Sequence, residues 1–386
     1  MKNELDQLLS SATDAGDVPG VLAMAFDREG ITYEGAFGER VLGSGSMMEV
    51  DTTALIFSMT KAVTGAAAMQ LDEQGKLSLD SPAGDVCPDL ADVQVLEGLA
   101  DDGTPMLRPP STPVTLRHLL THTSGFVYDI WNADFGAYLE ATGTPSVLSL
   151  ELASLRTPIM FDPGTRWEYG TGIDWAGQMV EAATGQTLGQ YFAENLFAPL
   201  GMSDTGFAPT EDMMSRAAGM HARLPDGGLA PMELPAPENP QFEMGGGGLM
   251  STMADYTRFC RMVLNGGELD GKRIMSAETV DAMCTNAMGD LRVRKLVTAN
   301  PAFSNDAEFF PGVEKSWGLT FQINEEPLPT GRPAGGLSWA GLANSYFWID
   351  RTNGIGGVYA TQILPFADQK SIDLFHAFET TVYDSI

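Results

Sequence analysis

The chain has 386 residues, of which 44% are hydrophobic and 19% charged, and its 51 acidic against 22 basic side chains give a formal net charge of −29. This length and balance suit one large globular domain or two closely packed ones. The negative charge repels phosphate backbones and anionic lipid surfaces, so neither nucleic acid nor a membrane is an expected partner, and we expect a solvated acidic surface.

The cysteines and the N-terminal segment indicate a compartment. Cys87, Cys260 and Cys284 are odd in number and widely spaced, and no C-x-x-C occurs, so neither a disulfide framework nor a zinc site is expected. Residues 1–17 carry acidic side chains where a signal peptide needs an apolar stretch, and no window approaches 18 uninterrupted apolar residues. We therefore expect a cytoplasmic protein with buried free thiols.

In chain order, the first predicted element is an amphipathic helix over residues 5–16. Two strand-like runs in residues 20–39 follow, and the sequence DREG at 27–30 predicts the turn of a hairpin between them. Residues 51–58 lead into a strongly helical segment, 59–75, which stops at Gly75. Residues 77–107 are rich in Asp, Pro and Gly, and this composition predicts a loop.

The second half of the chain predicts helices and then strands. Thr115 is placed to cap a short helix at 116–122, and helical periodicity recurs at 173–185, 188–201 and 253–267. The runs 317–324, 344–350 and 354–363 are aromatic and β-branched and predict strands, with turns at 329–336 and 350–354. The last 19 residues, 368–386, predict a helix.

Strands at both ends of the chain, with helices between them, predict an α+β fold. We expect one central antiparallel sheet flanked by helices, built from residues 1–75 and 250–386, and a mostly helical region inserted at 76–249. A cleft between the sheet and the inserted region would face the start of the helix at Ser58.

The sequence Ser58-Met59-Thr60-Lys61 places a serine three residues before a lysine at this helix start. Residues three apart share a helix face, so the Lys61 amine can return over the Ser58 hydroxyl. The backbone N–H groups of the first turn add positive potential, and a desolvated lysine can lose its proton near neutral pH and act as a base. Taken alone, the motif also fits an N-cap serine followed by a surface lysine.

Later segments favour the catalytic interpretation. Tyr169 lies in a Gly-rich loop, RWEYGTG, and the run GGLSWAG enters a strand where the backbone can approach a ligand closely. With LRHLLTHTSG at 116–125, FDPGTRWEYGTG at 161–172 and GGGGLMST at 245–252, the chain resembles the serine β-lactamase and penicillin-binding-protein superfamily over residues 15–380. S-x-x-K is a signature of that superfamily. The branch it resembles includes class C β-lactamases and family VIII carboxylesterases.

The resemblance implies a β-lactamase/transpeptidase-like fold and assigns roles to named residues. Ser58 is implied as the acylated nucleophile. Lys61 and Tyr169 are implied as its activating pair, in which a neighbouring cation lowers the pKa of the tyrosine, so that phenolate or amine takes the hydroxyl proton. The backbone amides of Ser58 and Leu342 would form an oxyanion hole. No metal and no cofactor are implied.

Two departures from the lactamase pattern imply the substrate class. Trp339-Ala340-Gly341 stands where lactamases have Lys-Thr-Gly, so the cation that receives a lactam carboxylate is missing, and Thr171 replaces an Asn. Both changes resemble the esterase branch, and they imply an apolar substrate wall involving Trp339, Gly341 and Thr171. We therefore expect a carboxylesterase for small-molecule, short- to medium-chain esters.

Other enzymes could use the same Ser-Lys-Tyr site: a β-lactamase, a D-amino-acid peptidase, an amide hydrolase such as a nylon-oligomer hydrolase, or an acyltransferase. Outside enzymes, the alternative is a binding module that keeps the fold without the activity. The intact set of Ser58, Lys61 and Tyr169 argues against that alternative. The sequence gives no indication of the oligomeric state.

Further motifs have competing interpretations. His118 and His122 have the i,i+4 spacing of zinc ligands, but the residue after His118 is Leu rather than Glu and no third ligand is evident, so structural roles are favoured. Ser338 in GGLSWAG resembles a nucleophile elbow, but Ala340 stands at its last position and a strand follows. Glycines 245–248 lack the Lys-Ser/Thr of a phosphate loop, which favours close packing beside the cleft.

Large side chains remain to be placed. Trp131, Trp167 and Trp175 could line a substrate cleft, although aromatic residues more often belong to a core. Arg294 and Arg332 could fold into the cleft and replace the missing cation.

Overall fold

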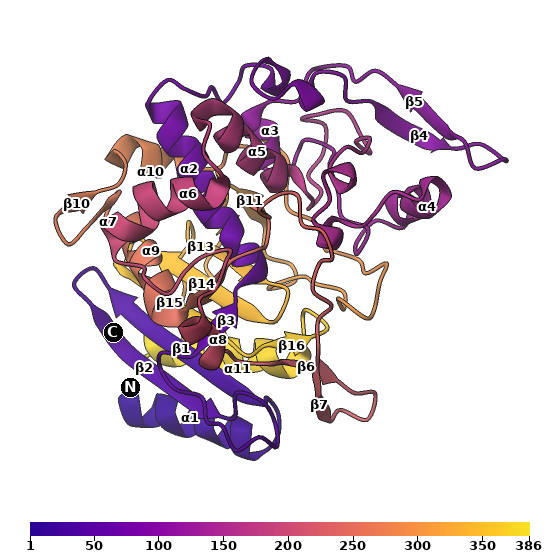
Figure 1. Ribbon diagram of the computed structural model, residues 1–386. Coiled ribbons are helices and arrows are strands. Elements are labelled where there is room, and N and C mark those ends of the chain that lie inside the picture. Colours follow the sequence, from indigo (N-terminus) through magenta and orange to yellow (C-terminus); the bar gives the residue numbers. More distant parts are fainter.

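The computed structural model describes residues 1–386 and contains a seven-stranded antiparallel sheet with helices on both faces (Figure 1). The strand order is β11-β12-β13-β14-β15-β1-β2. The strands are β1 (Gly20–Asp27), β2 (Ile31–Gly38), β11 (Lys315–Trp317), β12 (Gln322–Asn324), β13 (Leu337–Gly341), β14 (Ser345–Asp350) and β15 (Ile355–Ala360). Both ends of the chain therefore contribute to one sheet, as the strand patterns predicted.

Two predicted turns set the register of this sheet. In the first hairpin the Asp27 side chain accepts hydrogen bonds from the amides of Glu29 and Gly30, both at 2.8 Å, and β1 pairs with β2 across it. Between β14 and β15 the Asp350 carboxylate accepts the amide of Thr352 at 2.8 Å, and Gly354 takes a left-handed φ of +73°. Asp at the first turn position and Gly at a positive φ are typical of such turns.

Helices cover the two faces of the sheet. On one face lie α1 (Lys2–Asp14) and α11 (Gln369–Tyr383), where Phe375 stacks on Tyr346 with ring centroids 4.8 Å apart. On the other face lies α9 (Met253–Leu264), whose Tyr256 contacts Phe347 of β14 at 5.3 Å. Because successive side chains of a strand point to opposite faces, β14 feeds both layers of the core.

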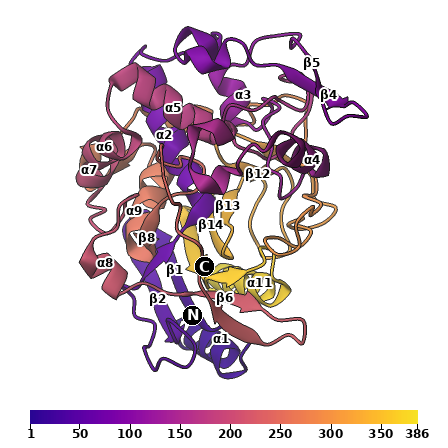
Figure 2. The same cartoon turned by 45° about the vertical axis from the view of Figure 1, so that its right-hand side comes forward.

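The region of the molecule away from the sheet is mostly helical. It is built around α2 (Thr60–Glu73), which packs against α5 (Gly172–Thr184) (Figures 1 and 2). Its other helices are α3 (Leu116–Leu120), α4 (Ala133–Thr142), α6 (Leu188–Phe192), α7 (Ala198–Leu200) and α10 (Ala277–Met283), whereas α8 (Glu211–Ser215) lies beside the sheet. Small sheets pair β3 (Thr53–Leu55) with β8 (Met250–Thr252), β9 (Glu268–Leu269) with β10 (Lys272–Arg273), and β6 (Met220–Arg223) with β7 (Leu229–Met232) and β16 (Ile363–Leu364).

Two sequence predictions about local structure are wrong. Residues 77–107 are not only loop: β4 (Val95–Leu99) and β5 (Pro105–Arg108) form a hairpin that projects from the molecule (Figure 1). The run 317–324 is not one strand, because β11 turns back into β12 so that Trp317 pairs with Gln322. Thr320 in that turn has a φ of 146°, which a straight strand would not require.

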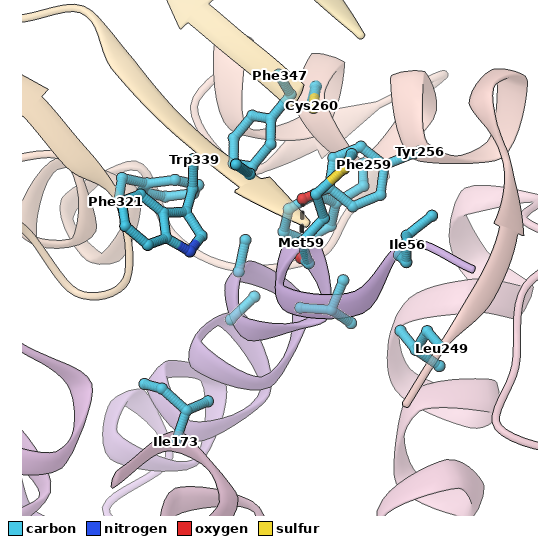
Figure 3. Packing of buried hydrophobic residues seen from close by; sticks show 14 of the residues in the cluster. Ile56, Met59, Ile173, Leu249, Tyr256, Phe259, Cys260, Phe321, Trp339 and Phe347 are labelled. Atoms are coloured by element: carbon cyan, nitrogen blue, oxygen red, sulfur yellow. Dashed lines mark hydrogen bonds between the residues drawn. The ribbon is translucent and has the colours of Figure 1, made fainter. Parts of the chain in front are cut away.

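A large apolar core joins the sheet to α2 and fixes the helix start. Figure 3 shows Met59 and Ile56 beneath Tyr256, Phe259 and Phe347. The Tyr256 hydroxyl donates to the Met59 carbonyl at 2.9 Å, and the Ile56 amide donates to the Leu249 carbonyl at 3.1 Å. No helix of the structure combines the length and the apolar character that a membrane crossing needs.

Candidate active site

Ser58 lies on a strained turn at the junction of strand and helix. It belongs to the short 3-10 turn η1 (Phe57–Met59), which continues directly into α2, and β13 and β14 lie against this turn. Phe57, immediately before it, has a φ of 42°, a left-handed conformation that is unfavourable for a bulky side chain. Such strain persists only where surrounding contacts hold it, and it is common at active sites. The Ser58 side chain remains half-buried.

Lys61 is completely buried on the first turn of α2, rather than on the protein surface. Its Nζ lies 3.2 Å from the Ser58 Oγ, 3.0 Å from the Tyr128 hydroxyl and 2.6 Å from the Gly246 carbonyl oxygen. It also lies 4.8 Å from the centroid of the Tyr169 ring. The structure thus brings Ser58, Lys61 and Tyr169 together, with the amine in hydrogen-bond contact with the serine.

The burial of Lys61 changes its protonation. Desolvation disfavours the charged ammonium and lowers the pKa of Lys61 from its usual 10.5 to about 7, while the charge of Asp174 acts in the opposite direction. A substantial fraction of the side chain is therefore the neutral amine near neutral pH, and that form can accept a proton from Ser58.

The pKa of Tyr169 is shifted in the direction opposite to the one expected. Burial raises the pKa of its phenol well above the usual value, and hydrogen bonding to Ser58 and Trp339 compensates only in part. The expectation of a lowered tyrosine pKa is therefore wrong, because desolvation outweighs the neighbouring groups. Tyr169 is a phenol with a proton to donate, and Lys61 is the group suited to act as the base.

Trp339 does not present the expected open apolar wall. It is only 5% exposed, its ring packs 4.6 Å from Trp317, and its Nε1 donates a hydrogen bond to the Tyr169 hydroxyl at 3.1 Å. Thr171, also expected at the substrate wall, is buried and lines a small pocket beside Tyr128.

Gly341 and Leu342 bring the end of β13 close to the Ser58 turn. A Cβ on Gly341 would lie 2.3 Å from the Ile56 carbonyl oxygen, so only glycine allows this approach. Leu342 follows the strand, is half-buried, and its amide makes no backbone hydrogen bond. An unpaired N–H at this place suits the predicted oxyanion-hole donor.

This close approach leads to a first prediction. Gly341→Ala should force β13 away from η1 and displace the Leu342 amide, lowering kcat by about 10²-fold, the scale for loss of one oxyanion donor. Gly30→Ala is a control for general effects of the substitution, because nothing lies within 4 Å of its Cβ position and, like Gly341, it has no left-handed φ. Steady-state kinetics on both folded variants would check this, and equal kcat values for Gly341→Ala and the unmodified protein would contradict it.

Two residues of the site were not predicted from the sequence: Tyr128 lies against Lys61, and Asp174 is buried at the start of α5. The hydrogen bond from Lys61 to the Gly246 carbonyl was not predicted either, although the glycines were expected beside the cleft. An acidic residue five positions after Tyr169, within an otherwise apolar helical stretch, is a signal that could have identified Asp174. Tyr128 carries no comparable signal, because an aromatic residue in GFVYDIW reads equally well as core.

His118 and His122, which have the spacing of zinc ligands, make different contacts. His118 caps α3 through its reciprocal hydrogen bonds with Thr115. His122 is buried with its ring 4.6 Å from that of Tyr169, and its Nδ1 accepts the Gly170 amide at 3.4 Å. No group of three His, Cys, Asp or Glu side chains is placed to hold a metal ion.

Ser338 and the glycine run also differ from their alternative interpretations. Ser338 pairs in register with Trp348, whose ring contacts Phe375 of α11, so it faces away from Ser58. Gly245 and Gly246 pack beside the site as predicted: the Gly245 carbonyl accepts the Thr64 hydroxyl at 2.7 Å.

Of the three tryptophans, only Trp131 is half-buried over the site, with its ring 5.4 Å from that of Tyr169, whereas Trp167 and Trp175 are buried in the core. Arg332 is buried in an ion pair with Glu379 at 2.6 Å and does not fill the cleft. Arg294 is exposed and lines a pocket that Trp339 also lines.

Known proteins resemble this chain along nearly its whole length. The chain matches the family described as Beta-lactamase over residues 5–380. Lovastatin esterase of Penicillium rubens is 32% identical over 98% of both chains, and monacolin J acid methylbutanoyltransferase of Aspergillus terreus is 31% identical over 98% of this chain and 95% of its own length. The solved structure of unliganded simvastatin synthase from Aspergillus terreus matches with a TM-score of 0.87 and 30% identity, covering 99% of this chain and 98% of that one.

Proposed function

The chain belongs to the Beta-lactamase family, and from that premise we propose that it is a carboxylesterase of the family VIII type that forms an acyl-enzyme on Ser58. The observation that carries the proposal is the buried Lys61 amine, 3.2 Å from the Ser58 hydroxyl, with a pKa lowered toward neutrality. The relatives include an esterase and acyltransferases, which act by moving acyl groups.

In the acylation step, the neutral Lys61 amine takes the proton of Ser58 while the Ser58 Oγ attacks the ester carbonyl carbon. The amides of Ser58 and Leu342 receive the developing negative charge on the carbonyl oxygen. When the C–O bond of the ester breaks, the Tyr169 phenol donates a proton to the departing alkoxide and regains one from the Lys61 ammonium. Water then hydrolyses the acyl-enzyme by the reverse sequence of proton transfers.

The pH dependence follows from the state of Lys61. Only the deprotonated amine can accept the serine proton, so kcat/KM should fall as the pH decreases through the pKa of about 7. Tyr169 remains protonated throughout this range because burial raises its pKa.

The proposed substrates are neutral short- to medium-chain esters. Trp339 places no cation where a lactam carboxylate would bind, and its one polar atom is occupied by Tyr169. A charge-assisted hydrogen bond from a lysine there would be worth roughly 1.5–3 kcal/mol. The net charge of −29 also disfavours the approach of anionic substrates.

This substrate class gives a second prediction. On the unmodified protein, kcat/KM for nitrophenyl butyrate should exceed that for nitrocefin by at least about tenfold, the ratio that one missing charge-assisted bond gives. Arg294→Gln tests whether Arg294 takes the place of the missing lysine near Trp339. This variant should have the same ratio of the two kcat/KM values as the unmodified protein. A lactam value equal to or above the ester value would overturn the esterase assignment and leave the Ser58 mechanism standing.

A second candidate is acyl transfer to an alcohol in place of water, since a relative at 31% identity is named as a methylbutanoyltransferase. The same acyl-enzyme would serve both reactions, and the acceptor decides between them. Adding an apolar alcohol to the ester assay would separate them: an ester of the added alcohol as the main product supports transfer, and free acid as the main product supports hydrolysis.

A further inference from the structure

Asp174 is a buried acid whose presence the ester chemistry above does not explain. It lies on the first turn of α5, where α5 packs against α2, and is 1% exposed. Its Oδ1 accepts the Gly246 amide at 2.8 Å, and its Oδ2 has no hydrogen-bond partner. A buried carboxylate with an unpaired oxygen is costly, so a function is expected to maintain it.

Gly246 links this carboxylate to Lys61. Its amide donates to Asp174, and its carbonyl oxygen accepts the Lys61 Nζ at 2.6 Å. A Cβ on Gly246 would lie 2.5 Å from the Asp174 Oδ2, so a glycine is needed for the carboxylate to come this close. The acid, the glycine and the lysine therefore form one connected arrangement between α5 and α2.

From this geometry we propose that Asp174 is a positioning residue that holds Lys61 in place through Gly246 and sets the pH at which the amine becomes a base. The inference rests on the proposed function only in giving Lys61 the role of base. Asp174 does not touch Ser58 and takes no part in bond formation.

The other titratable groups that face Lys61 cannot supply this charge. Burial raises the pKa of both Tyr128 and Tyr169, so both phenols stay neutral. Burial and the nearby Lys61 lower the pKa of His122 well below its usual value, so the imidazole is neutral as well. Burial raises the pKa of Asp174 to about 6, while Lys61 and the Gly246 amide lower it, so the carboxylate is charged at neutral pH. It is the one group whose charge favours the ammonium form of Lys61 against desolvation. Without it, Lys61 would lose its proton at a still lower pH and be a weaker base.

The direct test is a titration of Lys61 that does not depend on any substrate. The chain has seven lysines, so 13C labelling at the lysine ε carbon gives few resonances, and Lys61→Met identifies the relevant one. Asp174→Asn keeps an oxygen to accept the Gly246 amide but removes the charge. We expect the Lys61 midpoint to fall by about one pH unit or more in this variant, the scale of one neighbouring charge. Asp174→Glu, which keeps the charge, should restore part of that shift.

The matched control is Asp255→Asn, since Asp255 is also buried in the first turn of a helix but bonds to Thr205 and the Asp204 amide. It should leave the midpoint unchanged. Equal midpoints in the Asp174→Asn variant and the unmodified protein would overturn the proposal. If Asp174→Asn does not fold, the unmodified protein still decides: the Lys61 and Asp174 resonances should share inflection points, and independent titrations would refute the coupling.

The rate profile separates positioning from a merely structural role. Below the unmodified midpoint, Asp174→Asn should retain relatively more free amine, and above it the less basic amine should react more slowly, so the two kcat/KM profiles should cross. A uniform decrease at every pH would show a structural effect alone. If the protein turns over no ester while the Lys61 midpoint still falls in Asp174→Asn, that result would reject the proposed function and leave this inference standing.

Discussion

Replacing Ser58 with alanine is expected to lower ester hydrolysis by at least ~10³-fold while leaving a folded protein, because covalent catalysis fails on that scale when its nucleophile is removed. The side chain is half-buried and its hydroxyl contacts Lys61, so its loss removes few packing contacts. Circular dichroism and a thermal melt would establish folding, and kcat/KM for nitrophenyl butyrate would give the loss.

Ser338→Ala is the matched control, since Ser338 is also a half-buried serine but faces α11. It should retain nearly full activity. If Ser338→Ala lost activity and Ser58→Ala kept it, the nucleophile would be Ser338, and the assignment of Ser58 would be wrong.

Lys61→Met and Tyr169→Phe are each expected to cost at least ~10³-fold in kcat, and the double variant should be little worse than either single one. The reason is that the proton taken by Lys61 must be returned through Tyr169 to the departing alkoxide, so the two groups act as a unit. Steady-state kinetics on the three variants would check this, and losses that multiply would show independent roles.

Both substitutions should also lower stability. Lys61→Met leaves the buried Gly246 carbonyl without its hydrogen-bond donor, which should cost about 1–3 kcal/mol of unfolding free energy. Tyr169→Phe leaves the buried Trp339 N–H without its partner, which should cost about 1–3 kcal/mol of unfolding free energy. Denaturant unfolding would measure both, and a Tyr169→Phe variant as stable as the unmodified protein would show that another acceptor takes the Trp339 N–H.

Much of the fold could be predicted because hydrophobic periodicity and turn residues act locally. The β1–β2 hairpin and the β14–β15 hairpin follow from short apolar, β-branched and aromatic runs and from Asp and Gly at their turns. The β11–β12 hairpin could not be predicted, since residues 319–324 alternate apolar and polar side chains as one strand would, and the reversal depends on tertiary contacts. Gly318, at that reversal, lies so close to the Met283 carbonyl that a Cβ would come within 2.2 Å of it.

The site could be predicted only where residues share a short motif. Ser58 and Lys61 are three positions apart on one helix, so their contact follows from helix geometry. Tyr128 and Gly246 contact Lys61, and Asp174 contacts Gly246, from three distant segments whose meeting no spacing in the sequence predicts. The orientation of Trp339 was equally hidden, because its hydrogen bond to Tyr169 depends on the placement of β13.

Acid-quenched mass spectrometry of the protein during turnover of nitrophenyl butyrate shows directly whether an acyl-enzyme forms on Ser58. We expect one butyryl group per chain, attached to the peptide that contains Ser58 and absent from the Ser58→Ala variant. We also expect the rate of labelling to decrease as the pH falls through about 7, where Lys61 becomes protonated. A butyryl group on any other residue, or turnover with no covalent species under conditions where acylation outpaces hydrolysis, would contradict an acyl-enzyme on Ser58.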